Sequence, residues 1–148
     1  METVQISKIS ITYLRVSIGI IYFWFGALKF FHGYSPAEDL AINTITKLTI
    51  GMIDAPINIF LLAIWECLIG LLLIFGIMVR PVLIFLFIHM ICTFLPMVFF
   101  PNISFNGEPY RFTLVGQYIM KNIVIICAGY IIWQTTPTAS THIVSEVR

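Results

Sequence analysis

The stretch FWFGALKFFHGYSPAEDL, residues 23–40, decides the fold because two kinds of helix meet within it. Its first half ends a long apolar run and keeps one lysine, Lys29, close to the end of that run. Its second half carries the signals of a new helix: Ser35 can cap it, Pro36 suits its first position and Glu38 completes a capping box. The stretch therefore predicts a membrane-spanning helix followed at once by a second helix.

Composition places the chain in a lipid bilayer. Of its 148 residues, 59% are hydrophobic and only 10% are charged, whereas a soluble domain has about 25% charged residues. The net charge of +1 is small and the basic residues are scattered, which argues against nucleic acid as a partner. The three cysteines stand singly in apolar runs, so neither a disulfide framework nor a zinc site is expected.

Four apolar stretches are long enough to cross a bilayer as helices, which takes about 20 residues. They cover about residues 9–31, 57–78, 81–100 and 117–133. The first is longer than the core of a signal peptide and no small-residue cleavage site follows it, so we expect it to remain as a span. The sequence thus predicts an all-α fold: an integral membrane four-helix bundle that forms a single transmembrane domain over residues 1–148.

Both long loops emerge on the same side of this bundle, which we call the loop side. The first loop predicts a short amphipathic interfacial helix between the first and second spans. Its expected apolar face consists of Leu40, Ala41, Ile45 and Leu48, and its expected polar face of Glu38, Asp39, Asn43, Thr46 and Lys47. The second loop, residues 101–116, is expected to fold back over the bundle, with a turn at Asn106 and Gly107.

An even number of spans puts both termini on the side opposite to the loops. The basic residues of the terminal side are Lys8, Arg80 and Arg148, and those of the loop side are Lys47 and Arg111. The positive-inside rule then predicts cytoplasmic termini. Arg15 and Arg80 belong to the terminal side, where we expect them to anchor the helices to lipid headgroups.

Polar residues and glycines recur at helical spacing along the first span, which indicates a face turned toward protein. They are Arg15, Gly19, Tyr22, Gly26 and Lys29. The glycines permit another backbone to approach closely. Considered without other residues, Lys29 would be interpreted as a lysine near a helix end whose amine reaches outward to the lipid headgroups.

Glu66 changes the interpretation of Lys29. It lies near the middle of the second span, within LAIWECLIG at residues 62–70, where an unpaired carboxylate is costly. Lys29 and Lys121 both lie near the loop-side ends of their helices, from which a lysine can also reach inward. We therefore expect a buried cluster of Lys29, Glu66 and Lys121.

Further polar groups extend this cluster into a candidate ligand-binding site. Tyr22 lies on the same stripe as Lys29, and Gln117, Tyr118, Lys121 and Asn122 fill the first turns of the fourth span. The alternative is an interfacial belt, in which Tyr118 and Lys121 merely mark the membrane boundary.

His89, in the third span, is a secondary candidate. A lone histidine at this depth is more often a hydrogen-bonded core residue than a ligand, and a haem held by two histidines would need a second one at matching depth. The sequence offers neither a metal-ligand cluster nor a nucleophile paired with a base. No metal and no intrinsic cofactor is expected, and the residues leave open whether the protein is an enzyme.

Several of these motifs together resemble the DoxX-like family of small four-helix bacterial membrane proteins. They are Arg15-x3-Gly19-x6-Gly26-x2-Lys29, SPAEDLA (35–41), WECLIGLLLIFG (65–76) and GQYIMKN (116–122), and the likeness runs from about Arg15 to Trp133. Relatives include a subunit of a thiosulfate:quinone oxidoreductase and proteins linked to oxidative stress or sulfur compounds. The resemblance implies a bacterial-type inner membrane and a connection to quinones, but it supplies no catalytic residues.

Two functions compete at this point. In the first, a quinone-linked redox or oxidative-stress and sulfur-metabolism subunit, the cluster of Lys29, Glu66 and Lys121 binds a quinone or a small anion, Glu66 carries protons, and a partner redox subunit delivers electrons. In the second, a non-catalytic accessory or scaffold subunit of a larger membrane complex, the buried charges only fix the register of the bundle. A carrier has less support, because the chain lacks an evident internal repeat or broken helix.

Overall fold

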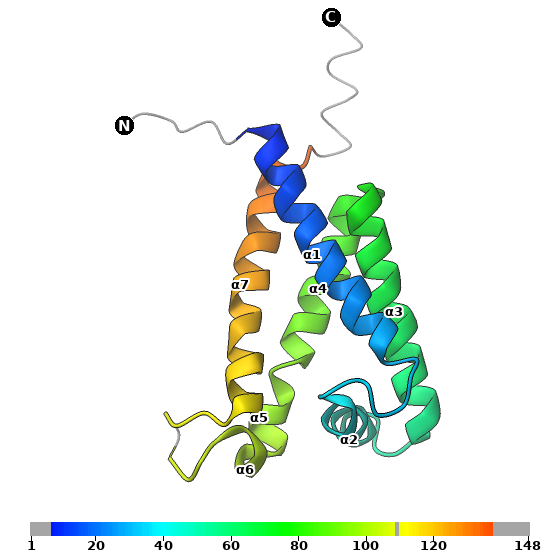
Figure 1. The fold of residues 1–148 in the computed structure, drawn as a ribbon, viewed down its shortest axis with the longest axis vertical. Helices are drawn as coiled ribbons and strands as arrows, with labels where there is room; N and C mark the ends of the chain where they lie inside the picture. Colours follow the sequence, from blue (N-terminus) through cyan, green and yellow to red (C-terminus); the bar gives the residue numbers. More distant parts are fainter. Residues whose placement is uncertain (1–6, 109, 138–148) are drawn as a thin grey trace, which may run out of the picture.

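The computed structural model describes residues 7–108 and 110–137, and four long helices dominate this part of the chain (Figure 1). These are α1 (Lys8–Leu28), α3 (Ala55–Phe75), α4 (Val79–Cys92) and α7 (Leu114–Thr135). Three short helices lie at the loop side: α2 (Glu38–Leu48), α5 (Leu95–Phe99) and α6 (Pro101–Ser104). The start of α1 and the end of α7 lie together at the opposite side, as the even number of spans predicts.

The four predicted spans correspond to helices that are long and apolar enough to cross a membrane, with α4 and α5 counted together as Val79–Phe99. The prediction of an all-α membrane bundle with a short helix between its first two spans is therefore confirmed. The buried apolar core fills the bundle between α1, α3, α4 and α7. Its fully buried members are Leu73, Leu83, Leu86 and Ile132.

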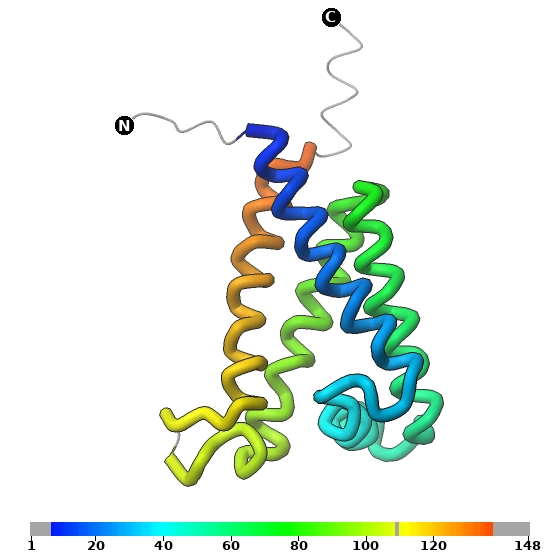
Figure 2. The backbone as a smooth tube through the Cα atoms, in the orientation of Figure 1, coloured from blue at the N-terminus to red at the C-terminus, as the bar shows by residue number. Residues whose placement is uncertain are grey.

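The closest packing in the bundle joins α1 to α3, which Figure 2 shows running side by side toward the loop side. A Cβ on Gly70 would lie 2.5 Å from the amide nitrogen of Phe23 and 2.7 Å from the carbonyl oxygen of Gly19. A Cβ on Gly26 would lie 2.8 Å from the Cβ of Glu66. A Cβ on Gly19 would lie 2.8 Å from the carbonyl oxygen of Gly70. Since real Cβ atoms essentially never come so close, this approach depends on glycine at all three positions.

The third span is broken, in contrast to the continuous helix predicted over residues 81–100. Helix α4 ends at Cys92, Thr93 and Phe94 form a turn, and α5 begins at Leu95. The cause is Pro96, because a proline has no N–H to donate and its ring clashes with the carbonyl four residues earlier, here that of Cys92. The fourth span begins at Leu114, where the Thr113 side chain accepts a hydrogen bond from the Gly116 amide at 3.1 Å.

The predicted interfacial helix is present as α2, but its predicted cap is wrong. The helix begins at Glu38 after Ala37, and no side chain caps it. Ser35 is buried and accepts the Glu38 amide with its backbone carbonyl at 3.1 Å. The capping box does not form because the Glu38 carboxylate bonds to the preceding loop instead, accepting the Gly33 amide at 2.8 Å.

The two faces of α2 also differ from the prediction. Glu38 and Thr44 are buried and Leu48 is exposed, although Leu40 and Ile45 are half-buried as expected. Thr46, placed on the polar face, accepts a hydrogen bond from the buried Asn58 side chain at 3.2 Å. Polar contacts to α3 thus determine which face of α2 turns inward, since a buried amide such as that of Asn58 requires a partner.

The second loop folds back on itself beside α7 and contains the predicted turn. The Asn106 amide donates to the Arg111 carbonyl at 2.7 Å, and Gly107 adopts a left-handed φ of 77° that suits glycine. An isolated antiparallel bridge joins Phe105 to Phe112. These contacts hold the loop against the start of α7.

Arg15 and Arg80, the predicted headgroup anchors, make hydrogen bonds within the bundle. Arg15 donates to the carbonyl oxygens of Leu73 and Ile74 in the last turn of α3. Arg80 donates to the carbonyl of Thr136, just after α7, at 2.9 Å, and its guanidinium also lies over the Trp133 ring. Each arginine therefore places its positive charge at carbonyl oxygens of a helix C-terminus, where the helix dipole favours a cation.

Candidate functional site

The predicted ion pair between Lys29 and Glu66 is present. Lys29 directly follows α1 as its C-cap residue, and its amine lies 2.5 Å from Glu66 Oε2 and 3.3 Å from the Phe25 carbonyl oxygen. The Lys29 and Glu66 side chains are only 8% and 9% exposed. Gly26 makes the contact possible, because its missing side chain lets Glu66 approach α1 directly.

His89 is the second partner of Glu66. Its Nε2 atom lies 3.5 Å from Glu66 Oε1, and its side chain is 11% exposed. The His89 ring also meets the ring of Tyr22 edge-on, with a centroid separation of 5.6 Å. Tyr22, Lys29, Glu66 and His89, from three helices, therefore form one buried group that we call the polar cluster.

Two atoms of the polar cluster have no hydrogen-bond partner: the Tyr22 hydroxyl and His89 Nδ1, both buried. Burying a polar atom without a partner costs about 1–3 kcal/mol. Such atoms are rare in folded proteins and commonly mark the place of a water molecule or a ligand. The polar cluster thus has free hydrogen-bonding capacity at Tyr22 and His89, while the carboxylate and the amine are already paired.

The fourth-span residues of the predicted site do not join the polar cluster. Lys121 is exposed, and its amine lies 5.0 Å from the centroid of the Tyr118 ring rather than at Glu66. Gln117 is also exposed. Asn122 instead donates to the Thr93 hydroxyl at 3.0 Å, which ties α7 to the end of α4. The structure separates Lys121 from Glu66 because the rotation of α7 turns Lys121 outward, as the interfacial-belt alternative requires.

A second carboxylate is held in place at the loop side. Glu38 accepts the Gly33 amide at 2.8 Å and lies 2.5 Å from Nδ1 of the exposed His32. The hydrogen bond from the Gly33 amide, reinforced by His32, lowers the pKa of Glu38 despite the opposing effect of burial. These contacts fix the turn between α1 and α2, directly after Lys29.

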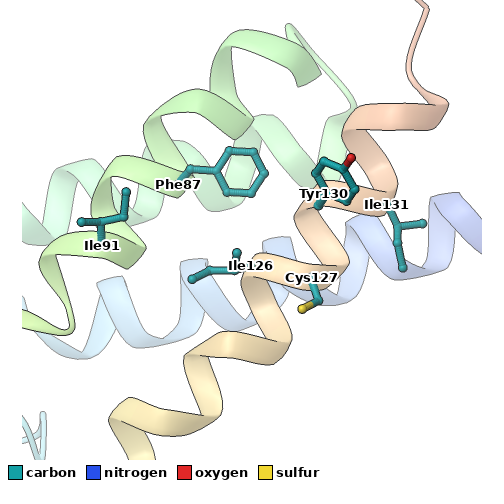
Figure 3. Close-up of a pocket in the computed structure, with 6 residues that line it drawn as sticks. All are labelled: Phe87, Ile91, Ile126, Cys127, Tyr130 and Ile131. Atoms are coloured by element: carbon teal, nitrogen blue, oxygen red, sulfur yellow. The ribbon is translucent and has the colours of Figure 1, made fainter.

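An apolar groove of about 520 Å³ lies between α4 and α7 (Figure 3). Its lining consists of Phe87, Ile91, Ile126, Cys127, Tyr130 and Ile131. This groove presents no charged group and none of the polar-cluster residues. Within residues 7–108 and 110–137, no three His, Cys, Asp or Glu side chains gather as metal ligands.

Four helices that can cross a bilayer, three of which contribute side chains to a buried polar cluster, define a small multi-pass membrane protein. The family model DoxX matches residues 10–100, more than half of the chain, so the protein belongs to the DoxX family. The matched region runs from α1 through α5 and contains all four residues of the polar cluster. Comparisons with curated proteins and with solved structures gave no match.

Proposed function

We propose that this protein is a quinone-linked redox subunit of a bacterial-type inner membrane and that the polar cluster binds the quinone headgroup. The observation that carries the proposal is the continuous contact of Lys29, Glu66 and His89 inside the membrane-spanning bundle. Ionisable residues at such depth are costly and commonly mark sites of ligand binding or proton transfer. Membership of the DoxX family and the resemblance described above support a quinone as the ligand.

The polar cluster has groups suited to the proton chemistry of a quinone. Reducing a quinone to a quinol consumes two electrons and two protons, and the protons have to reach a site away from water. Glu66 contacts both Lys29, at the loop-side end of α1, and His89, within α4. A carboxylate between an amine and an imidazole can accept a proton from one side and pass it to the other. In this proposal a partner redox subunit delivers the electrons.

The test is purification of the full chain in a mild detergent, followed by mass spectrometry of the extracted lipids. We expect near-stoichiometric quinone with the wild type and its loss from the Lys29→Met, Glu66→Gln double variant, which removes the carboxylate that faces the His89 ring but removes no large side chain. Lys121→Met is the matched control, since it removes an exposed lysine outside the polar cluster. A wild-type protein that carries no quinone, and binds none when it is added, would contradict the proposal.

A non-catalytic accessory subunit is the second candidate function. The observation that favours it is the short Lys29–Glu66 distance of 2.5 Å, because a pair that satisfies itself can serve packing alone. In that case the double variant should keep the protein partners of the wild type, and neither protein should bind quinone. Mass spectrometry of co-purified proteins in the same experiment separates the two functions.

A further inference from the structure

The Lys29–Glu66 pair is poorly suited to hold a ligand by charge. The Lys29 amine already contacts Glu66 Oε2 and the Phe25 carbonyl, and the opposite charges of the pair cancel. An anion brought into the bilayer needs a cation that is not already neutralised. The polar cluster therefore favours a neutral ligand, which has to be recognised by hydrogen bonds.

The position of the His89 ring determines which kind of hydrogen bond it can offer. Nε2 lies 3.5 Å from Glu66 Oε1, and a lone pair on Nε2 would face the negative carboxylate. We therefore assign the proton of the neutral imidazole to Nε2, which leaves Nδ1 as an acceptor. Nδ1 is buried and has no partner, so it requires a donor such as a hydroxyl group.

Tyr22 offers the second unpartnered group. Its side chain is 4% exposed, its ring is in contact with the His89 ring, and its hydroxyl has no partner. A phenolic hydroxyl can both donate and accept. A ligand oxygen that itself carries a proton can thus donate to His89 Nδ1, whereas a carbonyl oxygen can only accept.

We infer that Tyr22 and His89 select the reduced form of the ligand, a neutral aromatic diol whose hydroxyl donates to His89 Nδ1. This inference rests on the proposed function and adds that the site holds the quinol more tightly than the quinone. The preference follows from the number of hydrogen bonds. A quinol can satisfy Nδ1, and a quinone leaves it without a partner.

The experiment compares the binding of duroquinol, duroquinone and sulfate to the purified full chain in detergent, by equilibrium dialysis under nitrogen. One hydrogen bond corresponds to about a tenfold change in Kd, so we expect duroquinol to bind about tenfold more tightly than duroquinone and sulfate not to bind. Tyr22→Phe should weaken duroquinol binding by about tenfold. Tyr13→Phe is the control, because Tyr13 is an exposed tyrosine on the same helix.

Two variants at His89 test its ring nitrogens separately. His89→Gln keeps an amide near the position of Nε2, facing Glu66, but loses the acceptor at Nδ1, so the preference for duroquinol should disappear. His89→Asn keeps a polar atom near Nδ1, so part of the preference should remain. Thermal unfolding measurements show whether each variant is folded. If one of the two variants is unfolded, the binding measured with the folded variant decides the result.

Each outcome bears on a different statement. Equal or tighter binding of duroquinone by the wild type, or unchanged duroquinol binding by folded Tyr22→Phe and His89→Gln, would overturn the inference and leave the proposed function standing. Binding of sulfate without either ring compound would overturn the inference and the quinone proposal together. A wild-type protein that binds none of the three compounds would also overturn both the inference and the quinone proposal.

Discussion

The Lys29–Glu66 pair predicts a specific pattern of stability losses. Lys29→Met leaves the Glu66 carboxylate buried without its cation, because the two side chains are 8% and 9% exposed and their charged atoms are 2.5 Å apart. Deleting one partner of a buried pair costs about 3–5 kcal/mol. We expect a loss near the lower end of this range, since His89 Nε2 remains 3.5 Å from Glu66 Oε1 and its N–H dipole can offset part of the lost attraction.

The assay is equilibrium unfolding in mixed micelles, which gives the free energy of unfolding for each variant. Lys29→Met with Glu66→Gln should lose less stability than Lys29→Met alone, because the double variant has no uncompensated charge. Lys121→Met should stay within about 0.5 kcal/mol of the wild type, as is usual for exposed substitutions away from special contacts.

Two results would refute this reasoning. One is a Lys29→Met protein as stable as the wild type, which would mean that the carboxylate does not depend on the amine. The other is a double variant whose loss equals the sum of the two single losses, which would mean that the residues act independently.

The packing of α1 on α3 predicts that Gly70→Ala costs at least about 1–3 kcal/mol, the usual cost of overpacking, because its Cβ would lie 2.5 Å from a backbone nitrogen. Gly129→Ala would meet a movable phenyl ring at 3.0 Å and should cost less in thermal unfolding; equal losses would contradict the argument. The Glu38 contacts lower its pKa below the ordinary 4.5, so their stabilisation is complete above pH 4.5 and is lost as the pH falls through the lower folded value. The Gly33 amide proton shift should therefore titrate with a midpoint below 4.5 and not at all in Glu38→Gln, and a midpoint above 4.5 would be inconsistent with a lowered pKa. For the proposed orientation, cysteines at Lys47 and Glu108 should react with an impermeant thiol reagent outside the cell and one at Lys8 should not, in a protein without its native cysteines; the reverse pattern would invert the topology.

The sequence predicted the bundle and its central ion pair because both follow from the cost of polar groups in lipid. A carboxylate in the middle of a span has few acceptable partners, and Lys29 was near the correct depth on a face marked by glycines. The break in the third span was also within reach of the sequence, since Pro96 carries that signal. The absence of the Ser35 cap could not be predicted from the sequence, because it depends on the hydrogen bond that Glu38 makes with the preceding loop.

The rotation of each helix about its own axis explains why the directions of the Lys121 and His89 side chains could not be predicted from the sequence. Lys121 starts a helix from which a lysine can point outward or inward, and only the packing of α7 decides between the two directions. His89 was undervalued for the same reason, because one histidine on an apolar helix does not reveal which neighbour it faces. Its depth could have been matched to that of Glu66, since both lie near the middle of their spans.

The two arginines at the terminal side also bear on how the protein is made. Arg15 enters the membrane with the first helix, yet its carbonyl acceptors on α3 are synthesised 58 and 59 residues later. The acceptor of Arg80 follows 56 residues after it, at the end of α7. Until those segments arrive, each guanidinium lacks its final partner, and an arginine within a bilayer is costly. During biosynthesis two helix pairs should therefore form in order, first α1 with α3 and then α4 with α7. Each pair is complete when its arginine binds the carbonyl oxygens at the end of the helix that is made later.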